Sequence, residues 1–274
     1  MIPRDFITEW RAHAPWVADR QVEQDLVISR ALVAIFSVGA LAESLAFRGG
    51  TALYKLHLRP AARYSEDIDL VQTKPEPIGA TLDAIRGALD PWLGTAQRKV
   101  KPGTATLVYR FESEDLPSVP LRLKVEINTR EHFSVFGPHR QLFDVGSRWF
   151  GGRVDVPTFV LEELLATKLR ALFQRKKGRD LFDLAFALEK SGADPARIVH
   201  AFQRYMDAEG ARITRAMFEM NLAEKLSDPR FTADIGPLLA PGHAWQVEAA
   251  ARRVGEALVA RLPGEPWRGP PDRS

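Results

Sequence analysis

The spacing of apolar residues divides the chain into a mixed N-terminal half and a helical C-terminal half. Between about residues 15 and 46, apolar side chains such as Val22, Leu26 and Val33 recur at helical intervals. Residues 51–58 and 78–92 are also predicted to be helices, and residues 47–50 a turn. Residues 104–111 and 121–128 alternate between apolar and polar side chains, which predicts two strands, and residues 67–71 predict a third.

The pattern changes after Pro157, where helical spacing becomes continuous. Helices are predicted over residues 160–175, 180–190, 195–207, 211–227 and 244–262, with Gly, Pro and Asp between them. The tail, residues 263–274, is rich in Pro and Gly and is predicted to be disordered. We therefore expect an α+β fold, with a mixed β-sheet flanked by helices in residues 1–157 and a helical bundle in residues 158–262.

Composition narrows the class of protein only slightly. The 274 residues include 45% hydrophobic and 27% charged residues, which is an ordinary globular balance. The absence of cysteine excludes disulfides, thiolate metal sites and cysteine nucleophiles, and it fits a reducing, cytoplasmic location. No signal peptide or membrane-spanning stretch is expected. The net charge of +3 is compatible with a nucleic-acid or nucleotide partner.

The strongest chemical signal is a pair of aspartates one residue apart. Asp67 and Asp69 lie in an apolar stretch with Ile68 and Leu70, so the backbone is predicted to be a half-buried strand. Alternate residues of a strand face the same side, which brings the two carboxylates to one place. Like charges this close are costly unless a cation lies between them. The pair therefore predicts a site for a hard divalent cation that also contacts phosphate groups.

A glycine-rich turn precedes this strand. Gly49 and Gly50 would let the backbone approach a phosphate, and Thr51 is placed to cap the helix that follows. Sixteen residues separate Gly50 from Asp67, which leaves room for that helix and a loop. Ser65 would share the face of Asp67 and could bind phosphate or cap a turn. Arg63 and Lys55 are candidates for phosphate contacts or for surface charges.

A third carboxylate, Glu126, lies in the centre of the strand predicted over residues 121–128. On a neighbouring strand it could complete a two-metal site with the aspartates. Alternatively, it belongs to an outward-facing polar row and pairs with Lys124 or Arg122, which share its face.

The helical half carries a second group of charged residues. Lys168 lies beside an apolar helical stripe, so it either reaches solvent or faces a cleft in which it would neutralise phosphates. Asp180 is placed to cap the next helix, and Asp183 lies one turn further on. The basic run 175–179 is either a solvated loop or a phosphate-binding segment.

Two separated motifs resemble those of the AbiEii/AbiGii-type (MenT-like) nucleotidyltransferase toxins, which belong to the DNA polymerase beta-like superfamily. The first is GGTAL at residues 49–53 followed by RYSEDIDL at residues 63–70. The second is KLRA at residues 168–171 followed by RDLFDL at residues 179–184. Their order and spacing cover about residues 30–190, and the resemblance implies a nucleotidyltransferase-like sheet.

Carried over residue by residue, the resemblance implies roles at both motifs. Asp67 and Asp69 become ligands of Mg²⁺, or of Mn²⁺, and Glu126 lies where the wider superfamily has its third carboxylate. Lys168 becomes the nucleotide-binding lysine, and Asp180 or Asp183 the downstream acidic residue. The residues expected at the nucleotide phosphates are Gly49, Gly50, Thr51, Arg63 and Ser65.

The resemblance implies the toxin of a bacterial toxin–antitoxin or phage-defence system. Such an enzyme would transfer NMP from NTP to an acceptor hydroxyl, expected at the 3′ end of tRNA, and release pyrophosphate. It would have a cognate antitoxin protein as a partner. Two alternatives remain open: a nucleotide- or RNA-binding module without catalysis, and a nucleotidyltransferase that acts on a small molecule or a protein.

Overall fold

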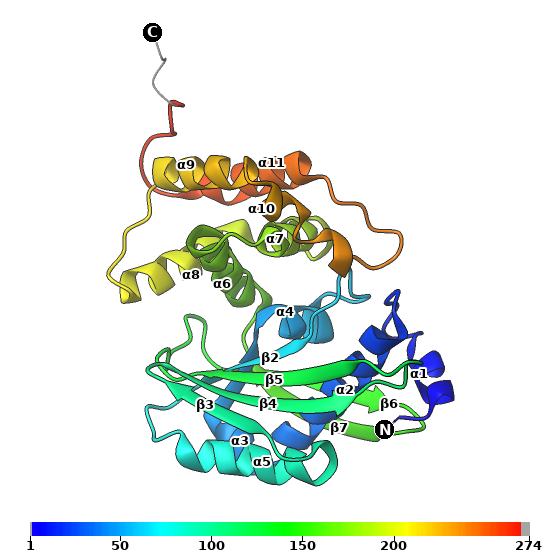
Figure 1. Cartoon of the computed structure of the whole chain (residues 1–274). Helices are drawn as coiled ribbons and strands as arrows, with labels where there is room; N and C mark the ends of the chain where they lie inside the picture. Colours follow the sequence, from blue (N-terminus) through cyan, green and yellow to red (C-terminus); the bar gives the residue numbers. More distant parts are fainter. Residues whose placement is uncertain (1, 270–274) are drawn as a thin grey trace. The chain divides into compact units, whose positions relative to one another are not determined.

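The computed structural model describes residues 2–269 and divides into two compact units (Figure 1). The first unit contains the chain up to Phe159 together with the short segment Leu239–His243. The second contains Val160–Leu238 and the described residues from Ala244 to residue 269. The first unit holds the aspartate pair, and the second holds Lys168.

A mixed sheet forms the centre of the first unit. Within the described residues it has seven strands in the order β3-β4-β5-β2-β1-β7-β6. Strand β2 runs parallel to β5, and β1 runs parallel to β7, while the other neighbours are antiparallel. The strands are β1 (Leu45–Arg48), β2 (Asp67–Gln72), β3 (Gln97–Lys101), β4 (Thr104–Glu112), β5 (Pro120–Asn128), β6 (His139–Gly146) and β7 (Gly151–Thr158).

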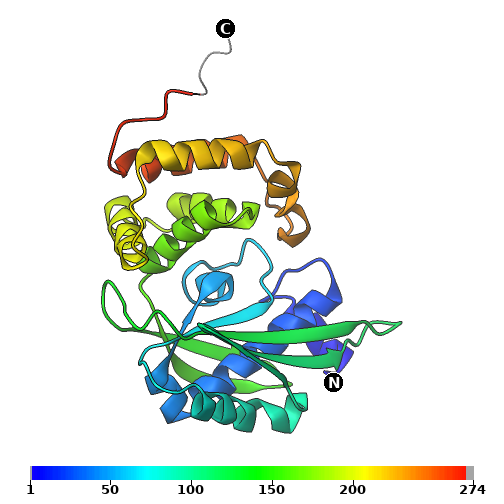
Figure 2. The ribbon, with the colours of Figure 1, turned by 60° about the vertical axis from the view of Figure 1, so that its left-hand side comes forward.

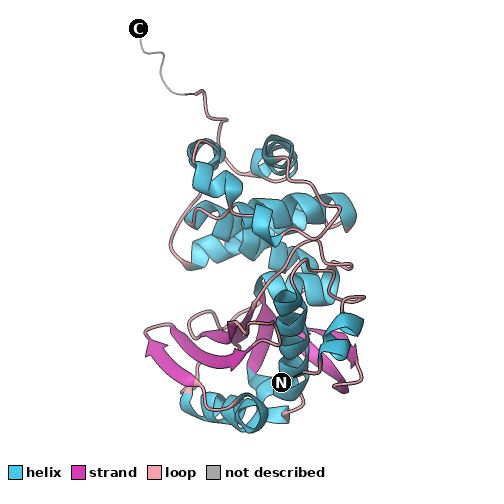
Figure 3. Ribbon diagram, turned by 45° about the vertical axis from the view of Figure 1, so that its right-hand side comes forward, coloured by secondary structure: helices cyan, strands magenta, loops and turns pink. Residues whose placement is uncertain are grey.

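Helices cover one face of this sheet (Figures 1 and 3). Helix α2 (Asp19–Phe36) packs against β2, β5 and β7, and its apolar residues are almost fully buried. Helices α3 (Gly39–Ser44) and α5 (Gly79–Leu93) lie beside it, and α1 (Arg4–Trp10) packs on α2. After β1 the chain enters α4 (Gly49–Ala52), which continues as a π-helix, η1 (Leu53–His57).

Strands β4 and β5 have one buried and one accessible face. The two strands pair along their whole length and form a long ribbon (Figure 2). Leu107 and Tyr109 of β4, with Leu123 and Val125 of β5, point into the apolar core below. The alternate residues are half-buried or exposed and mostly polar. This alternation fixes the register, because a slip of one residue would expose the core face.

The second unit is helical. Its elements are α6 (Leu161–Gln174), α7 (Gly178–Lys190), α8 (Pro195–Ala208), α9 (Arg215–Leu226), α10 (Pro229–Ala233), η2 (Gly236–Leu238), α11 (Val247–Ala257) and η3 (Val259–Arg261). Asp194 caps α8 by accepting the Ala196 N–H at 2.8 Å, and Pro195 fills the first helical position. The main chain at Pro263 and Trp267 bonds to α9 residues, whereas residues 270–274 of the predicted disordered tail lie outside the described residues.

The predicted α+β architecture is confirmed, but several element boundaries were wrong. The helix expected over residues 15–46 is α2 and α3, and residues 45–48, assigned to the end of that helix and to a turn, form strand β1. Strands β3, β6 and β7 were not predicted. The helix expected over residues 211–227 begins only at Arg215, because Thr214 caps it. No helix among the described residues is long and apolar enough to cross a membrane.

One buried acid makes the stability of the first unit depend on pH. Glu23 in α2 is 1% exposed, and its Oε2 accepts the Glu114 N–H at 2.9 Å. Burial, reinforced by Asp115, raises the pKa of Glu23 from 4.5 to about 7. Because the folded state then holds a proton that the unfolded state has lost, stability falls as pH rises from about 4.5 to 7.

We therefore expect Glu23→Gln to flatten this pH dependence. At pH 8 the variant should be more stable than the original chain by up to about 3 kcal/mol, at about 1.4 kcal/mol per pH unit. Urea unfolding at pH 5 and pH 8 measures the difference. Glu76→Gln, at an exposed position, is the control and should leave the dependence intact. An equally steep loss of stability in the Glu23→Gln variant would contradict the assignment.

Candidate active site

The turn from β1 into α4 lies directly against the aspartate strand. Arg48, the last residue of β1, is paired across the sheet with Asp69, so Gly49 follows beside the Asp69 side chain. Gly49 has a φ of +81°, and a Cβ atom there would collide with the Asp69 carboxylate, lying 2.9 Å from its Cγ. A Cβ atom at Gly50 would lie 2.6 Å from the Arg63 guanidinium. Gly49 is required by its backbone conformation and by close approach, whereas a side chain at Gly50 would displace the Arg63 guanidinium.

Hydrogen bonds tie this turn to the segment before β2. The Thr51 side chain lies 2.8 Å from Ser65 Oγ and donates to the Asp67 carbonyl at 2.5 Å. Its predicted role as a helix cap was wrong, because α4 begins two residues earlier and no side chain caps it. Arg63 is 2% exposed and donates to the Tyr64 carbonyl at 2.9 Å, so the surface-charge alternative for Arg63 was also wrong. Gly50, Thr51, Arg63 and Ser65 thus form one packed cluster.

The two aspartates share a face of β2 with Glu126 of β5. In the parallel pair, Asp67 is aligned with Lys124 and Asp69 with Glu126. Lys124 Nζ lies 3.0 Å from Asp67 Oδ2 and 3.2 Å from Glu126 Oε2. Burial alone would lower the pKa of the Lys124 ammonium, but the two carboxylates outweigh it and raise that pKa above its ordinary value. The geometry supports the ion-pair alternative for Glu126.

The donor set at β2 fits a magnesium ion bound largely through water and phosphate. Within the described residues, no group of three or more His, Cys, Asp or Glu side chains is arranged to hold a metal ion. Mg²⁺, however, needs only one or two carboxylates when substrate phosphates supply other ligands. Lys124 shows that this face attracts a cation, because its ammonium lies between Asp67 and Glu126.

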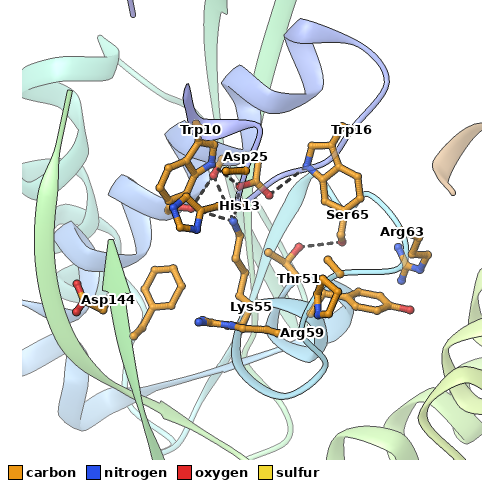
Figure 4. A pocket seen from close by; sticks show the side chains of 16 residues that line it. Trp10, His13, Trp16, Asp25, Thr51, Lys55, Arg59, Arg63, Ser65 and Asp144 are labelled. Atoms are coloured by element: carbon orange, nitrogen blue, oxygen red, sulfur yellow. Dashed lines mark hydrogen bonds and ion pairs between the residues drawn. The ribbon is translucent and has the colours of Figure 1, made fainter. Parts of the chain in front are cut away.

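A cavity of about 280 Å³ lies beside the Thr51–Ser65 cluster (Figure 4). On one side, Asp25 accepts hydrogen bonds from the indoles of Trp10 at 2.8 Å and Trp16 at 3.3 Å and pairs with Lys55 at 2.6 Å. Burial lowers the pKa of Lys55, and Asp25 opposes that effect. The surface-charge alternative for Lys55 was therefore wrong, and its phosphate contact stays a prediction. Lys55 links η1 to α2 and supports the turn that carries the glycines.

The second unit contains a buried charge cluster made by α6 and α7. Lys168 Nζ lies 2.8 Å from Asp183 Oδ2 and 3.2 Å from Asp180 Oδ1. Both aspartates have no exposed surface, and Arg175 binds both oxygens of Asp180 at 2.7 and 2.9 Å. Burial would raise the pKa of Asp180, but Lys168 and Arg175 hold it below its ordinary value. Asp180 is thus part of this cluster, and α7 begins at Gly178 without a side-chain cap.

The basic run 175–179 is neutralised within the same unit. Besides the Arg175 contact, Lys176 lies 2.9 Å from Glu224, and Lys177 lies 3.4 Å from Asp234. Arg179 lies 3.9 Å from Asp234. Each cation of the run therefore has an acidic partner, so the run offers less free positive charge than its sequence suggests.

Comparison with known proteins identifies a family that covers both motifs. Residues 30–253 match the model of the family described as nucleotidyl transferase AbiEii toxin, type IV toxin–antitoxin system. The chain belongs to the AbiEii nucleotidyltransferase toxin family. The match spans the glycine turn, the aspartate strand and the Lys168 cluster, so the resemblance seen in the two sequence motifs is confirmed and the protein is a nucleotidyltransferase.

Solved structures support the same fold for this AbiEii chain. MenT4, a nucleotidyltransferase toxin from Mycobacterium tuberculosis H37Rv, is 19% identical, with a TM-score of 0.67 and coverage of 96% of this chain and 91% of MenT4. JHP933 from Helicobacter pylori is also 19% identical, with a TM-score of 0.55 and coverage of 88% and 90%. None of the curated proteins compared with the chain matches it.

Sequence reasoning missed several contacts that support the AbiEii site. The Asp25–Lys55 pair joins residues 30 positions apart, and the 2.5 Å pair of Arg48 with Glu131 joins residues 83 apart. Neither pair has a local sequence pattern. The one available signal was that Lys55 and Asp25 both lie within apolar stretches, where an unpaired charge is costly.

We expect Gly49→Ala to damage the AbiEii site through the backbone. The positive φ and the collision with Asp69 should destabilise the first unit by about 1–3 kcal/mol and displace the Asp69 carboxylate. The free energy of unfolding measured in urea and the rate of nucleotidyl transfer should both fall. Gly87→Ala, inside α5 with open space around it, is the control and should be neutral or slightly stabilising. If Gly49→Ala and Gly87→Ala had the same stability and transfer rate, the close packing of Gly49 against Asp69 would not be required.

We expect Lys168→Met to destabilise the second unit by about 3–5 kcal/mol, because two buried carboxylates lose a shared cation. Hydrogen exchange of the α6 and α7 amides measures this directly. Adding Asp183→Asn should restore much of the protection, since Asp180 keeps Arg175. Unchanged exchange in the single variant would show that the cluster contributes little to stability.

Proposed function

We propose that this AbiEii-family chain transfers a nucleoside monophosphate from NTP to an acceptor hydroxyl in a metal-dependent reaction, with Asp67 and Asp69 at its centre. The observation that carries the proposal is the packing of Gly49 against Asp69. It brings a helix N-terminus, a phosphate-approachable turn and two carboxylates to one place. We propose the 3′ end of tRNA as the acceptor, Mg²⁺ as the metal, the cytoplasm as the location and a cognate antitoxin as the restraint.

In this proposal the residues of the first unit bind and orient the substrate. Asp67 and Asp69 would hold the divalent ion, and the turn of Gly49 and Gly50 with Ser65 would contact the phosphates. The ion, when bound, would neutralise charge on the triphosphate. The acceptor hydroxyl gives up its proton to solvent, and its oxygen forms a bond to the α-phosphorus as the bond from that phosphorus to the α,β-bridging oxygen breaks, so that pyrophosphate leaves. Positioning and electrostatics supply most of the rate in such transfers.

Two further residues receive narrower roles. Lys168 is proposed as the nucleotide-binding lysine on the basis of the family motif, and it would have to exchange an ion pair with Asp180 or Asp183 to contact a phosphate. Glu126 is proposed as the partner of Lys124 and not as a metal ligand, and Lys124 would have to release Asp67 for that aspartate to hold the ion.

Asp67→Asn and Asp69→Asn should each reduce transfer at least about 100-fold, because a neutral amide binds a divalent cation poorly. The assay incubates the purified protein with total RNA and each α-labelled NTP and follows labelled RNA and pyrophosphate. Chelation should abolish transfer, and Mg²⁺ or Mn²⁺ should restore it. Asp83→Asn, an exposed acid on α5, is the matched control.

The same assay, run with RNA, small hydroxylated compounds or proteins as acceptors, distinguishes the proposed function from its alternatives. Labelling of small hydroxylated compounds or proteins, with none of RNA, would replace the proposed acceptor and keep the chemistry. Tight NTP binding without pyrophosphate release from any acceptor would favour a binding module. Undiminished transfer in both asparagine variants would refute the proposed site.

A further inference from the structure

We propose that the accessible face of β3, β4 and β5 is the surface that binds the phosphate backbone of the acceptor RNA. This proposal rests on the proposed function, because it places the acceptor beside the proposed catalytic carboxylates. The residues that would contact phosphate are Lys99 and Lys101 of β3, Arg110 of β4 and Arg122 of β5, which we call the basic face.

Strand register places the basic face on the same side of the sheet as the aspartates. Asp69 is aligned with Glu126, Glu126 with Thr106, and Thr106 with Lys99, in one row across four strands. Lys101 lies two residues along β3 from Lys99 and therefore faces the same way. At about 4.8 Å per strand, the row from Asp69 to Lys99 spans about 14 Å. A bound polynucleotide a few residues long could therefore reach from the basic face to the carboxylates.

Arginines extend the basic face in the other direction. Arg110 and Arg122 are aligned with each other, in the register row two residues from the one that holds Lys124 and Asp67. Both arginines are exposed. The basic face therefore continues the row of Asp69 at Lys99 and extends to both sides of it, at Lys101 and at the two arginines, which gives a chain of phosphates several adjacent contacts.

The four cations of the basic face have no ion-pair partner among the described residues. Arg110 makes only a 3.4 Å contact with Gln97 Oε1, and no side-chain hydrogen bond or ion pair involves the other three. This differs from the basic run 175–179, in which every cation is paired with an acid of its own unit. Unpaired cations retain their full attraction for an external polyanion.

The chemistry of the surface between these cations favours RNA over a lipid surface or an apolar partner. Thr104, Thr106, Gln97 and Asn128 share the face, and such side chains commonly bond to phosphates and sugars. Val108 is the main apolar residue among them, so the face lacks the apolar anchors that membrane insertion requires. Glu112 and Glu126 are the acids of β4 and β5 on this face, and Glu126 pairs with Lys124, so the cations remain in excess. A polar, extended surface of net positive charge fits a sugar–phosphate backbone without demanding a base sequence.

The test compares two double variants that remove the same charge. Lys99→Gln with Lys101→Gln neutralises the basic face, and Arg98→Gln with Lys74→Gln is the control. Arg98 lies on the same strand but is aligned with Leu107 and faces the other side, and Lys74 is exposed and follows β2. The probe is fluorescently labelled unfractionated tRNA, and anisotropy is measured without NTP at several salt concentrations.

We expect the basic-face variant to bind the tRNA roughly 10- to 30-fold more weakly at 0.1 M salt. The slope of log affinity against log salt should become shallower by about 1.4, since each lost phosphate contact is worth about 0.7 on a single strand. Binding of labelled NTP should not change. Equal affinity in the basic-face variant and the original chain would overturn the proposal, and so would an equal loss in the control variant.

A parallel measurement separates this proposal from the proposed function. Asp67→Asn should lose transfer and retain tRNA binding. If the original chain labels only small hydroxylated compounds and does not bind tRNA, the basic-face proposal fails while nucleotidyl transfer stands. If Asp67→Asn transfers normally, the proposed catalytic site fails, and the tRNA affinities still decide whether the basic face binds RNA.

Discussion

The close packing of the β1–α4 turn against β2 is the constraint on which the site depends. Because Arg48 is aligned with Asp69, the chain must leave β1 immediately beside a carboxylate, and only glycine fits there at a φ of +81°. The same turn then delivers Thr51 to Ser65 and to the Asp67 carbonyl. The glycine turn, Ser65 and strand β2 therefore pack together as one unit. The sequence spacing between them reflects the length of α4, η1 and the returning loop.

Charge balance explains how the sheet holds three carboxylates on one face. Lys124 lies between Asp67 and Glu126, and Arg48 beside Asp69 is paired with Glu131. The carboxylates thus lie among neighbouring cations, and this reduces the cost of their proximity. In the second unit Asp180 and Asp183 are fully buried, so their need for a neighbouring cation is greater, and they share Lys168. In each unit one lysine thus lies between two acids: Lys124 between Asp67 and Glu126, and Lys168 between Asp180 and Asp183.

The sequence was informative where a periodic pattern coincided with burial. Strands β2, β4 and β5 were predicted because their apolar residues face a core, and the aspartates and the Lys168 motif followed from local spacing. Strand β3 has five exposed residues and no apolar alternation, so its place in the sheet comes from backbone pairing with β4. Strand β1 is four residues long and continues an apolar helical pattern, and glycines flank or interrupt β6 and β7. The alternation of Val154 and Val156 with polar residues in β7 was a strand signal, but it is short and lies between glycines and a proline.

Ion-pair partners were the least predictable part of the site, and they determine which charges remain available for binding. By sequence, residues 175–179 are the densest basic run of the chain, yet folding gives each of their cations an acidic partner. Lys99 and Lys101 belong to the short basic stretch 98–101, whereas Arg110 and Arg122 lie singly on two other strands. Sheet register gathers them on one face, beside the aspartates and without acidic partners among the described residues. The charge available to a polyanion is therefore a property of the fold, and a count of basic residues along the chain does not reveal which cations have acidic partners.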